Sequence, residues 1–126
     1  MNWSAIGALF LGLAVMLGAF GAHALRDRLD AYSMGVYEKA VFYHFIHALG
    51  LLIVSFAPRI GALSASAAAW VCALLAAGIL IFSGSLYVLA MTGVRALGAI
   101  TPLGGVSFIA AWLLLAWYLL RGVQTP

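Results

Sequence analysis

Charged residues are scarce in this sequence. Among 126 residues there are only six Lys or Arg and three Asp or Glu, and 67% of the chain is hydrophobic. A water-soluble fold of this length needs polar surface to cover its core, and so few charges cannot supply it. The mean hydropathy of +1.17 agrees with this, because soluble domains are only about half apolar. The composition therefore excludes a soluble domain and predicts a membrane protein.

The chain also lacks the residue combinations that most enzyme chemistry needs. Its single cysteine, Cys72, falls within an apolar run, where it cannot form an internal disulfide and behaves as a small hydrophobic residue. We find no nucleophile with a neighbouring base, no carboxylate pair, no phosphate-cradling loop and no Cys/His metal motif. The basic residues form no patch for nucleic acid. We therefore expect no enzymatic activity, no cofactor and no nucleic-acid partner.

Four apolar runs are long enough to cross the hydrocarbon, which takes about 20 helical residues. They do not alternate strictly between polar and apolar residues as barrel strands do. The sequence thus predicts an all-α fold, a single four-helix transmembrane domain with short loops. The predicted helices cover residues 3–25, 36–57, 66–91 and 101–120.

Two helix ends carry local signals. The stretch Ala22-His23-Ala24 imitates the cleavage site of a secretory signal, but no Lys or Arg precedes the first run and the run is too long for a signal peptide. We therefore expect the first helix to remain in the mature protein. Thr101 followed by Pro102 is typical of an N-cap and a first helical residue, so this pair is expected to open the last helix.

Basic residues are divided unevenly between the two sides of the predicted bundle. Lys and Arg accumulate in cytoplasmic loops, so the side with more of them is predicted to face the cytoplasm, which leaves both termini outside. The same residues suit contact with lipid headgroups. One side of the predicted bundle carries four basic residues, Arg26, Arg28, Lys39 and Arg95. The other side carries two, Arg59 and Arg121.

Small and aromatic residues indicate how the helices associate. Lipid is as apolar as leucine, so membrane helices pack through small residues and interhelical hydrogen bonds. Expected contact positions are Ala14, Gly18 and Ala22 in the first helix, and Ala77, Gly78, Ser83, Gly84, Ser85 and Tyr87 in the third. Aromatic residues near helix ends usually anchor a protein at the membrane interface. The expected anchors are Trp3, Tyr37, Tyr43, Trp112, Trp117 and Tyr118.

Ionisable side chains also occur within the predicted spans. His44 and His47 lie one turn apart in the second helix, and His23 lies near the end of the first helix on the same side of the membrane. Glu38 and Lys39 stand at the mouth of the same hairpin. These five residues form the candidate polar cluster.

Three interpretations of the polar cluster are open. The imidazoles can hydrogen-bond between helices, which the sequence favours because polar residues commonly join membrane helices. They can line a path for protons, ions or small solutes, although no carboxylate lies in the middle of a span. They can also hold a metal or haem through His23, His44 and His47, although their spacing is not diagnostic.

Four motifs in a fixed order resemble a known family. They are GAFGAHAL at 18–25, YHFIHALGLL at 43–52, FSGSLY at 82–87, and TPLGG at 101–105 followed by AW. Together they resemble the uncharacterised family that joins bacterial YgdD-like inner-membrane proteins to animal transmembrane protein 256, domain of unknown function 423. The resemblance implies a small four-helix inner-membrane protein and supplies no established activity. Its motif positions here are Gly18, Gly21, His23, His44, His47, Ser83, Gly84, Tyr87, Pro102, Gly104 and Gly105.

Four helices are few to enclose a substrate path by themselves. The leading hypothesis is therefore a structural or accessory protein of the bacterial inner membrane, acting within a homo-oligomer or a larger membrane complex. The alternative is a small-solute, ion or proton channel or transporter that uses the histidines of the polar cluster.

Overall fold

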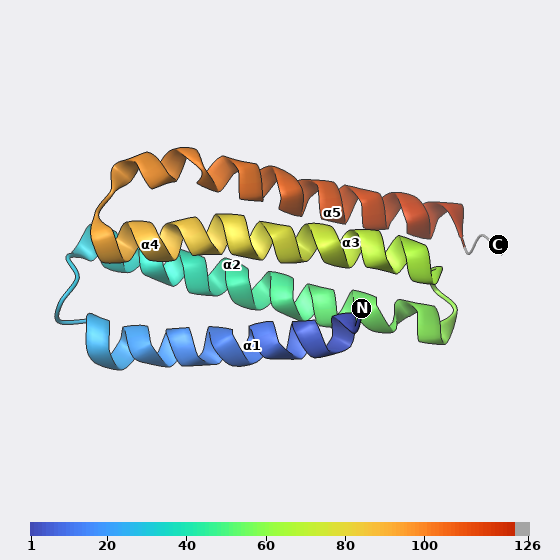
Figure 1. Ribbon diagram of the computed structural model, residues 1–126, viewed down its shortest axis with the longest axis horizontal. Helices are drawn as coiled ribbons and strands as arrows, with labels where there is room; N and C mark the ends of the chain where they lie inside the picture. Colours follow the sequence, from blue (N-terminus) through green and yellow to red (C-terminus); the bar gives the residue numbers. More distant parts are fainter. Residues whose placement is uncertain (123–126) are drawn as a thin grey trace.

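The computed structural model describes residues 1–122, and it folds them as a bundle of four long apolar helices (Figure 1). The helices that can span a membrane run Trp3–Leu25, Ala31–Ile60, Ala65–Thr92 and Arg95–Arg121. No strand occurs in the described part of the chain. The all-α prediction is confirmed.

Each of the four spans contains a change in helix type. The first consists of α1 (Trp3–Phe20) and the π-helical η1 (Gly21–Leu25), and the second of α2 (Ala31–Phe56) and the 3-10 helical η2 (Ala57–Ile60). The third consists of α3 (Ala65–Gly78), the π-helical η3 (Ile79–Ser83) and α4 (Gly84–Thr92). The fourth consists of the 3-10 helical η4 (Arg95–Ala99) and α5 (Thr101–Arg121).

The second helix begins at Ala31, earlier than the predicted start at residue 36. Asp30 caps this helix, because its Oδ1 accepts a hydrogen bond from the Ser33 backbone N–H at 2.7 Å. Such a cap satisfies one of the free N–H groups of the first turn. The hydrogen bonds from the Ser33 backbone and side chain also lower the pKa of Asp30. The prediction placed the start of this helix too late because it relied on apolar residues, whereas Asp30 and Ser33, which form the cap, are polar.

The start of the last helix also differs from the prediction. Thr101 is the first residue of α5 and Ile100 occupies the cap position, so the N-cap prediction for Thr101 was wrong. Pro102 lies in the first turn of α5. A backbone N–H there has no partner within the helix, so the missing N–H of proline costs no hydrogen bond. The Thr101 hydroxyl instead bonds the Ser85 hydroxyl at 2.6 Å, which ties α5 to α4.

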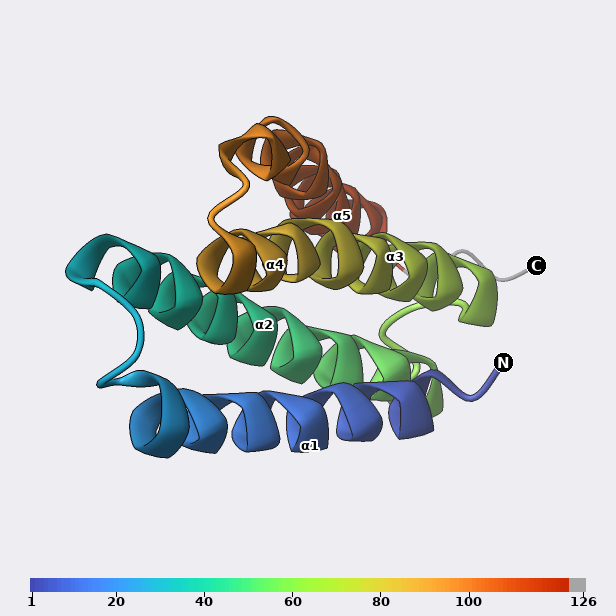
Figure 2. The same cartoon turned by 60° about the vertical axis from the view of Figure 1, so that its left-hand side comes forward.

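The helix α2 occupies the middle of the bundle. It lies against α1 on one side and against α3 and α4 on the other, while α5 packs over α3 and η3 (Figure 2). The N-terminus, the end of α5 and the α2–α3 connection lie at one end of the bundle, and the α1–α2 and α4–α5 connections lie at the opposite end (Figure 1).

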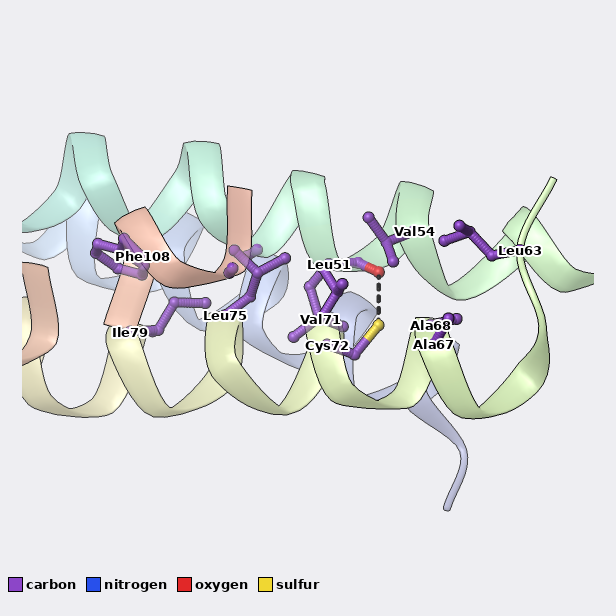
Figure 3. Close-up of a cluster of buried hydrophobic side chains, with 12 residues drawn as sticks. Leu51, Val54, Leu63, Ala67, Ala68, Val71, Cys72, Leu75, Ile79 and Phe108 are labelled. Atoms are coloured by element: carbon purple, nitrogen blue, oxygen red, sulfur yellow. Dashed lines mark hydrogen bonds between the residues drawn. The ribbon is translucent and has the colours of Figure 1, made fainter. Parts of the chain in front are cut away.

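The largest buried cluster joins α2 to α3 and is closed by residues of α5. Leu51, Val71 and Leu75 are fully buried there, and Cys72 lies among them (Figure 3). The Cys72 thiol donates a weak hydrogen bond to the Leu51 carbonyl oxygen at 3.7 Å. This cysteine therefore behaves as the small core residue that the sequence predicted.

Glycine allows the closest helix contacts in the bundle. A Cβ at Gly104 of α5 would overlap the Phe82 backbone, and one at Gly78 of α3 would overlap the Phe108 ring. Between α1 and α2, a Cβ at Gly7 would lie 3.1 Å from the Leu52 backbone nitrogen. These contacts follow the general rule that small residues let membrane helices approach closely.

The substitution Gly104→Ala should destabilise the bundle by about 1–3 kcal/mol, the usual cost of overpacking. The reason is that the new methyl group meets backbone atoms of Phe82, which cannot rotate away. Thermal unfolding in detergent, followed by circular dichroism, measures the change. The control is Gly12→Ala, where nothing lies within 4 Å of the added Cβ. Equal melting temperatures for the two variants would contradict the prediction.

Candidate functional site

The centre of the candidate site is a pair of buried histidines on α2. His44 is 1% exposed and His47 is 6% exposed. They lie one turn apart, yet their neighbours differ. His44 contacts side chains of α1 and α4, whereas His47 contacts side chains of α5. The two imidazoles therefore belong to separate environments.

His44 forms one side-chain hydrogen bond in the described part of the chain. Its Nδ1 lies 2.9 Å from the Tyr87 hydroxyl of α4, and its ring meets the edge of the Phe10 ring of α1. The Nε2 atom is buried without a hydrogen-bond partner among the described residues. The ring therefore joins two helices, with one nitrogen left unsatisfied.

The half-buried Tyr87 ring connects His44 to a buried tyrosine, Tyr37. Its ring packs edge-on against that of Tyr37, with the ring centroids 5.3 Å apart. The Tyr37 hydroxyl donates to the carbonyl oxygen of Leu17 on α1, and Gly21 leaves room for the Tyr37 ring because it has no side chain. Tyr37 is buried, so its prediction as an interfacial anchor was wrong. The two tyrosines thus link α1, α2 and α4.

His47 is held by its own helix and by α5. Its Nδ1 donates to the Tyr43 carbonyl oxygen at 2.7 Å, because a carbonyl can only accept a hydrogen bond. This bond places the proton of the neutral ring on Nδ1 and leaves the lone pair on Nε2. The ring stacks on Phe108 with centroids 3.5 Å apart, and it lies beside the Trp112 ring. The His47 ring therefore contributes to the contact between α2 and α5 by stacking on aromatic rings.

Serine hydroxyls make further hydrogen bonds between the helices. Ser83 is fully buried in η3 and donates to the Ala40 carbonyl oxygen of α2 at 2.9 Å. Ser107 of α5 donates to the Leu74 carbonyl oxygen of α3 at 2.7 Å. Ser107 was not among the contact positions expected from the sequence. Its signal was its position one turn after Gly104, on the face of α5 that packs against the third span.

The other members of the predicted polar cluster do not join this pair. His23 is exposed in η1, and Glu38 and Lys39 are exposed on α2. No hydrogen bond joins His23 to His44 or His47 within residues 1–122. Over the same residues, no group of three or more His, Cys, Asp or Glu side chains could hold a metal ion. The candidate polar cluster thus separates into a buried part, His44 and His47, and an exposed part, His23, Glu38 and Lys39.

The positions taken from the family resemblance have different surroundings. Gly21 and Gly104 lie in contacts that leave no space for a side chain, whereas Gly18 and Gly105 have ordinary contacts and Gly84 has no neighbour within 4 Å. In addition, Pro102 is exposed. Ser85, which was expected as a packing position and not from the resemblance, donates to the Phe82 carbonyl oxygen at 2.9 Å. Close packing therefore accounts for some of these positions and hydrogen bonding for others.

The chemistry of the site follows from its neutral donors and acceptors. Imidazole, phenol and hydroxyl groups meet backbone carbonyls across helix contacts. No Asp, Glu, Lys or Arg side chain is buried in residues 1–122. Because a bilayer offers no water to a free polar group, such bonds hold helices together. The arrangement suits helix association.

Comparison with known proteins agrees with the motifs. The family model described as "Protein of unknown function (DUF423)" matches residues 17–105. The chain is 50% identical over 110 residues to a UPF0382 membrane protein of Staphylococcus epidermidis, covering 87% of this chain and 88% of that one. It is 47% identical over 112 residues to the UPF0382 membrane protein YwdK of Bacillus subtilis, covering 87% and 89%.

No protein of solved structure matches the chain. The resemblance stated from the sequence motifs is confirmed by the family model, which spans most of the chain. The relatives are named as membrane proteins, in agreement with the four apolar helices of the structure. The chain is therefore a membrane protein and belongs to the DUF423 family, whose function is unknown.

Proposed function

We propose that this protein is a structural or accessory component of the bacterial plasma membrane, without catalytic activity, that works within a homo-oligomer or a larger membrane complex. The observation that carries the proposal is the use of the buried polar groups. Tyr37, Ser83 and the His44–Tyr87 pair each connect two helices. The polar residues of the bundle interior thus serve its assembly.

A channel or transporter remains the second candidate, because intramembrane ionisable residues commonly mark such paths. Two observations weigh against it. His47 stacks on Phe108 and His44 is sealed by Phe10 and Tyr87. The hollows found on the described part of the chain, of about 250–460 Å³, open on the outside of the bundle. A path would have to form between several copies.

The orientation of the protein follows from its loop charges. The end of the bundle that holds the α1–α2 and α4–α5 connections carries Arg26, Arg28 and Arg95, and Lys39 lies nearby on α2. The opposite end carries Arg59 and Arg121. The positive-inside rule therefore favours a cytoplasmic α1–α2 loop and both termini outside the cytoplasm.

The substitution Tyr87→Phe should destabilise the bundle by about 1 kcal/mol, because it leaves both nitrogens of the His44 ring without a side-chain partner. Thermal unfolding in detergent measures this loss. Tyr118→Phe is the matched control, since the Tyr118 hydroxyl makes no hydrogen bond in the described part of the chain. If Tyr87→Phe melts like the control, the His44–Tyr87 bond does not support the fold.

Single cysteines should report the proposed orientation. In a Cys72→Ala background, Ser66→Cys should react with a membrane-impermeant maleimide in intact cells, and Asp27→Cys should react only after permeabilisation. Both positions are exposed and lie at opposite ends of the bundle. The reverse labelling pattern would place the termini in the cytoplasm.

The assembly proposal is tested by native mass spectrometry of the protein purified in mild detergent at its native expression level. We expect copurifying subunits or a defined homo-oligomer, and liposomes of the pure protein should be impermeable to protons and ions. A proton or ion flux that is lost in His44→Ala and His47→Ala would replace this proposal with the channel. A monomer without partners would also contradict it.

A further inference from the structure

A hollow on the outside of the α1–α2 hairpin borders the buried polar site, with which it shares Gly21 and Tyr37. It has a volume of about 430 Å³ and lies between the end of the first span and the first half of α2. Figures 1 and 2 both show these helices side by side, joined at this end. The volume falls within the range of about 300–1,000 Å³ that is usual for small-molecule sites.

The deeper part of this hollow is apolar. Gly18 provides an open position on α1, and Val41 and Phe45 of α2 stand beside it, 3.5 and 3.9 Å from the site of a Cβ. Beyond Glu38 the lining continues along α2 to Ile46, which at 1.5 Å per residue is about 12 Å. One half of a hydrocarbon core about 30 Å thick has a similar depth. The hollow therefore has the length and polarity to hold an acyl chain within one leaflet.

The outer part of the same hollow carries one charge of each sign. Arg26 follows η1, Glu38 lies on α2, and both line the hollow. No ion pair joins them or any other residues within 1–122. Because both side chains line the same hollow, both charges are available to one bound headgroup.

We propose that this hollow binds a zwitterionic phospholipid whose headgroup carries a phosphate and a primary ammonium. The phosphate contacts the Arg26 guanidinium, which suits phosphate oxygens geometrically. The ammonium donates to the Glu38 carboxylate, and an acyl chain lies over Gly18 along α2. A quaternary ammonium has no N–H to donate to Glu38, and an anionic headgroup without an amine leaves that carboxylate unpaired.

Comparison with a second hollow of the bundle shows why charged residues in the lining decide which lipid headgroup is bound. About 460 Å³ in volume, it lies between the end of α2 and α5, and its lining contains no charged residue. Any lipid tail can lie there without regard to its headgroup. The hollow on α1 and α2 differs because its two unpaired charges complement both charges of one headgroup class.

The proposal is tested by incubating delipidated protein in detergent with phosphatidylethanolamine, phosphatidylcholine and phosphatidylglycerol of identical acyl chains, and counting retained lipids by native mass spectrometry. We expect phosphatidylethanolamine to be retained about tenfold better than either competitor, the effect of one charge-assisted hydrogen bond. Equal retention of the three lipids, or a preference for phosphatidylglycerol, would overturn the proposal.

Matched variants locate the contacts. Arg26→Gln and Glu38→Gln should each abolish the preference, while Arg28→Gln and Asp27→Asn should retain it, because Arg28 and Asp27 are exposed beside the hollow without lining it. All four positions are exposed, so folding should be preserved, and circular dichroism checks this. Loss of the preference in the control variants as well would show a general charge effect and overturn the assignment.

The acyl-chain contact needs a separate measurement. Ala22→Leu places a larger side chain in the hollow and should reduce retention of phosphatidylethanolamine, whereas Ala19→Leu, exposed on the same helix outside the hollow, should not. A phosphatidylethanolamine with a photoactivatable acyl terminus should label α2 around residues 42–46. Labelling spread evenly over the four helices would contradict binding of the lipid in this hollow.

Discussion

The hydrogen bonds that α2 makes with its neighbours are the contacts on which the rest of the bundle depends. Tyr37 donates to α1, Ser83 donates to an α2 carbonyl, and Tyr87 meets His44. Lipid surrounds the outer helix faces, so apolar side chains gain little by leaving it for a helix contact. Polar bonds and close backbone approach are what distinguish the folded bundle from separate helices in the same membrane.

Glycine and the two π-helical segments make these bonds possible. Gly21 opens η1, and its missing side chain leaves room for the Tyr37 ring, whose hydroxyl reaches α1. Ser83 ends η3, and from there its hydroxyl reaches the Ala40 carbonyl. A π turn holds an extra residue and often marks a specialised position in a helix. In this protein, both π segments lie where a neighbouring helix makes a buried polar contact with α2.

The sequence predicted the four spans because hydropathy is a property of each segment alone. The N-terminal turn of α2 was missed because Asp30 acts through a local polar cap. The division of the histidines could not be predicted, since one-turn spacing places His44 and His47 near each other on α2 but does not say which helix covers each ring. Tyr37 near a helix end resembled an interfacial anchor, and only the position of Gly21 on the neighbouring helix reveals its burial.

Charge pairing has almost no part in holding this bundle together. No ion pair occurs in residues 1–122, and the basic residues Arg59, Arg95 and Arg121 lie over the rings of Phe56, Tyr32 and Trp117 instead. Dissolved ions weaken interactions between exposed charges but cannot enter the contacts between buried helices. The stability of the fold should therefore depend little on ionic strength.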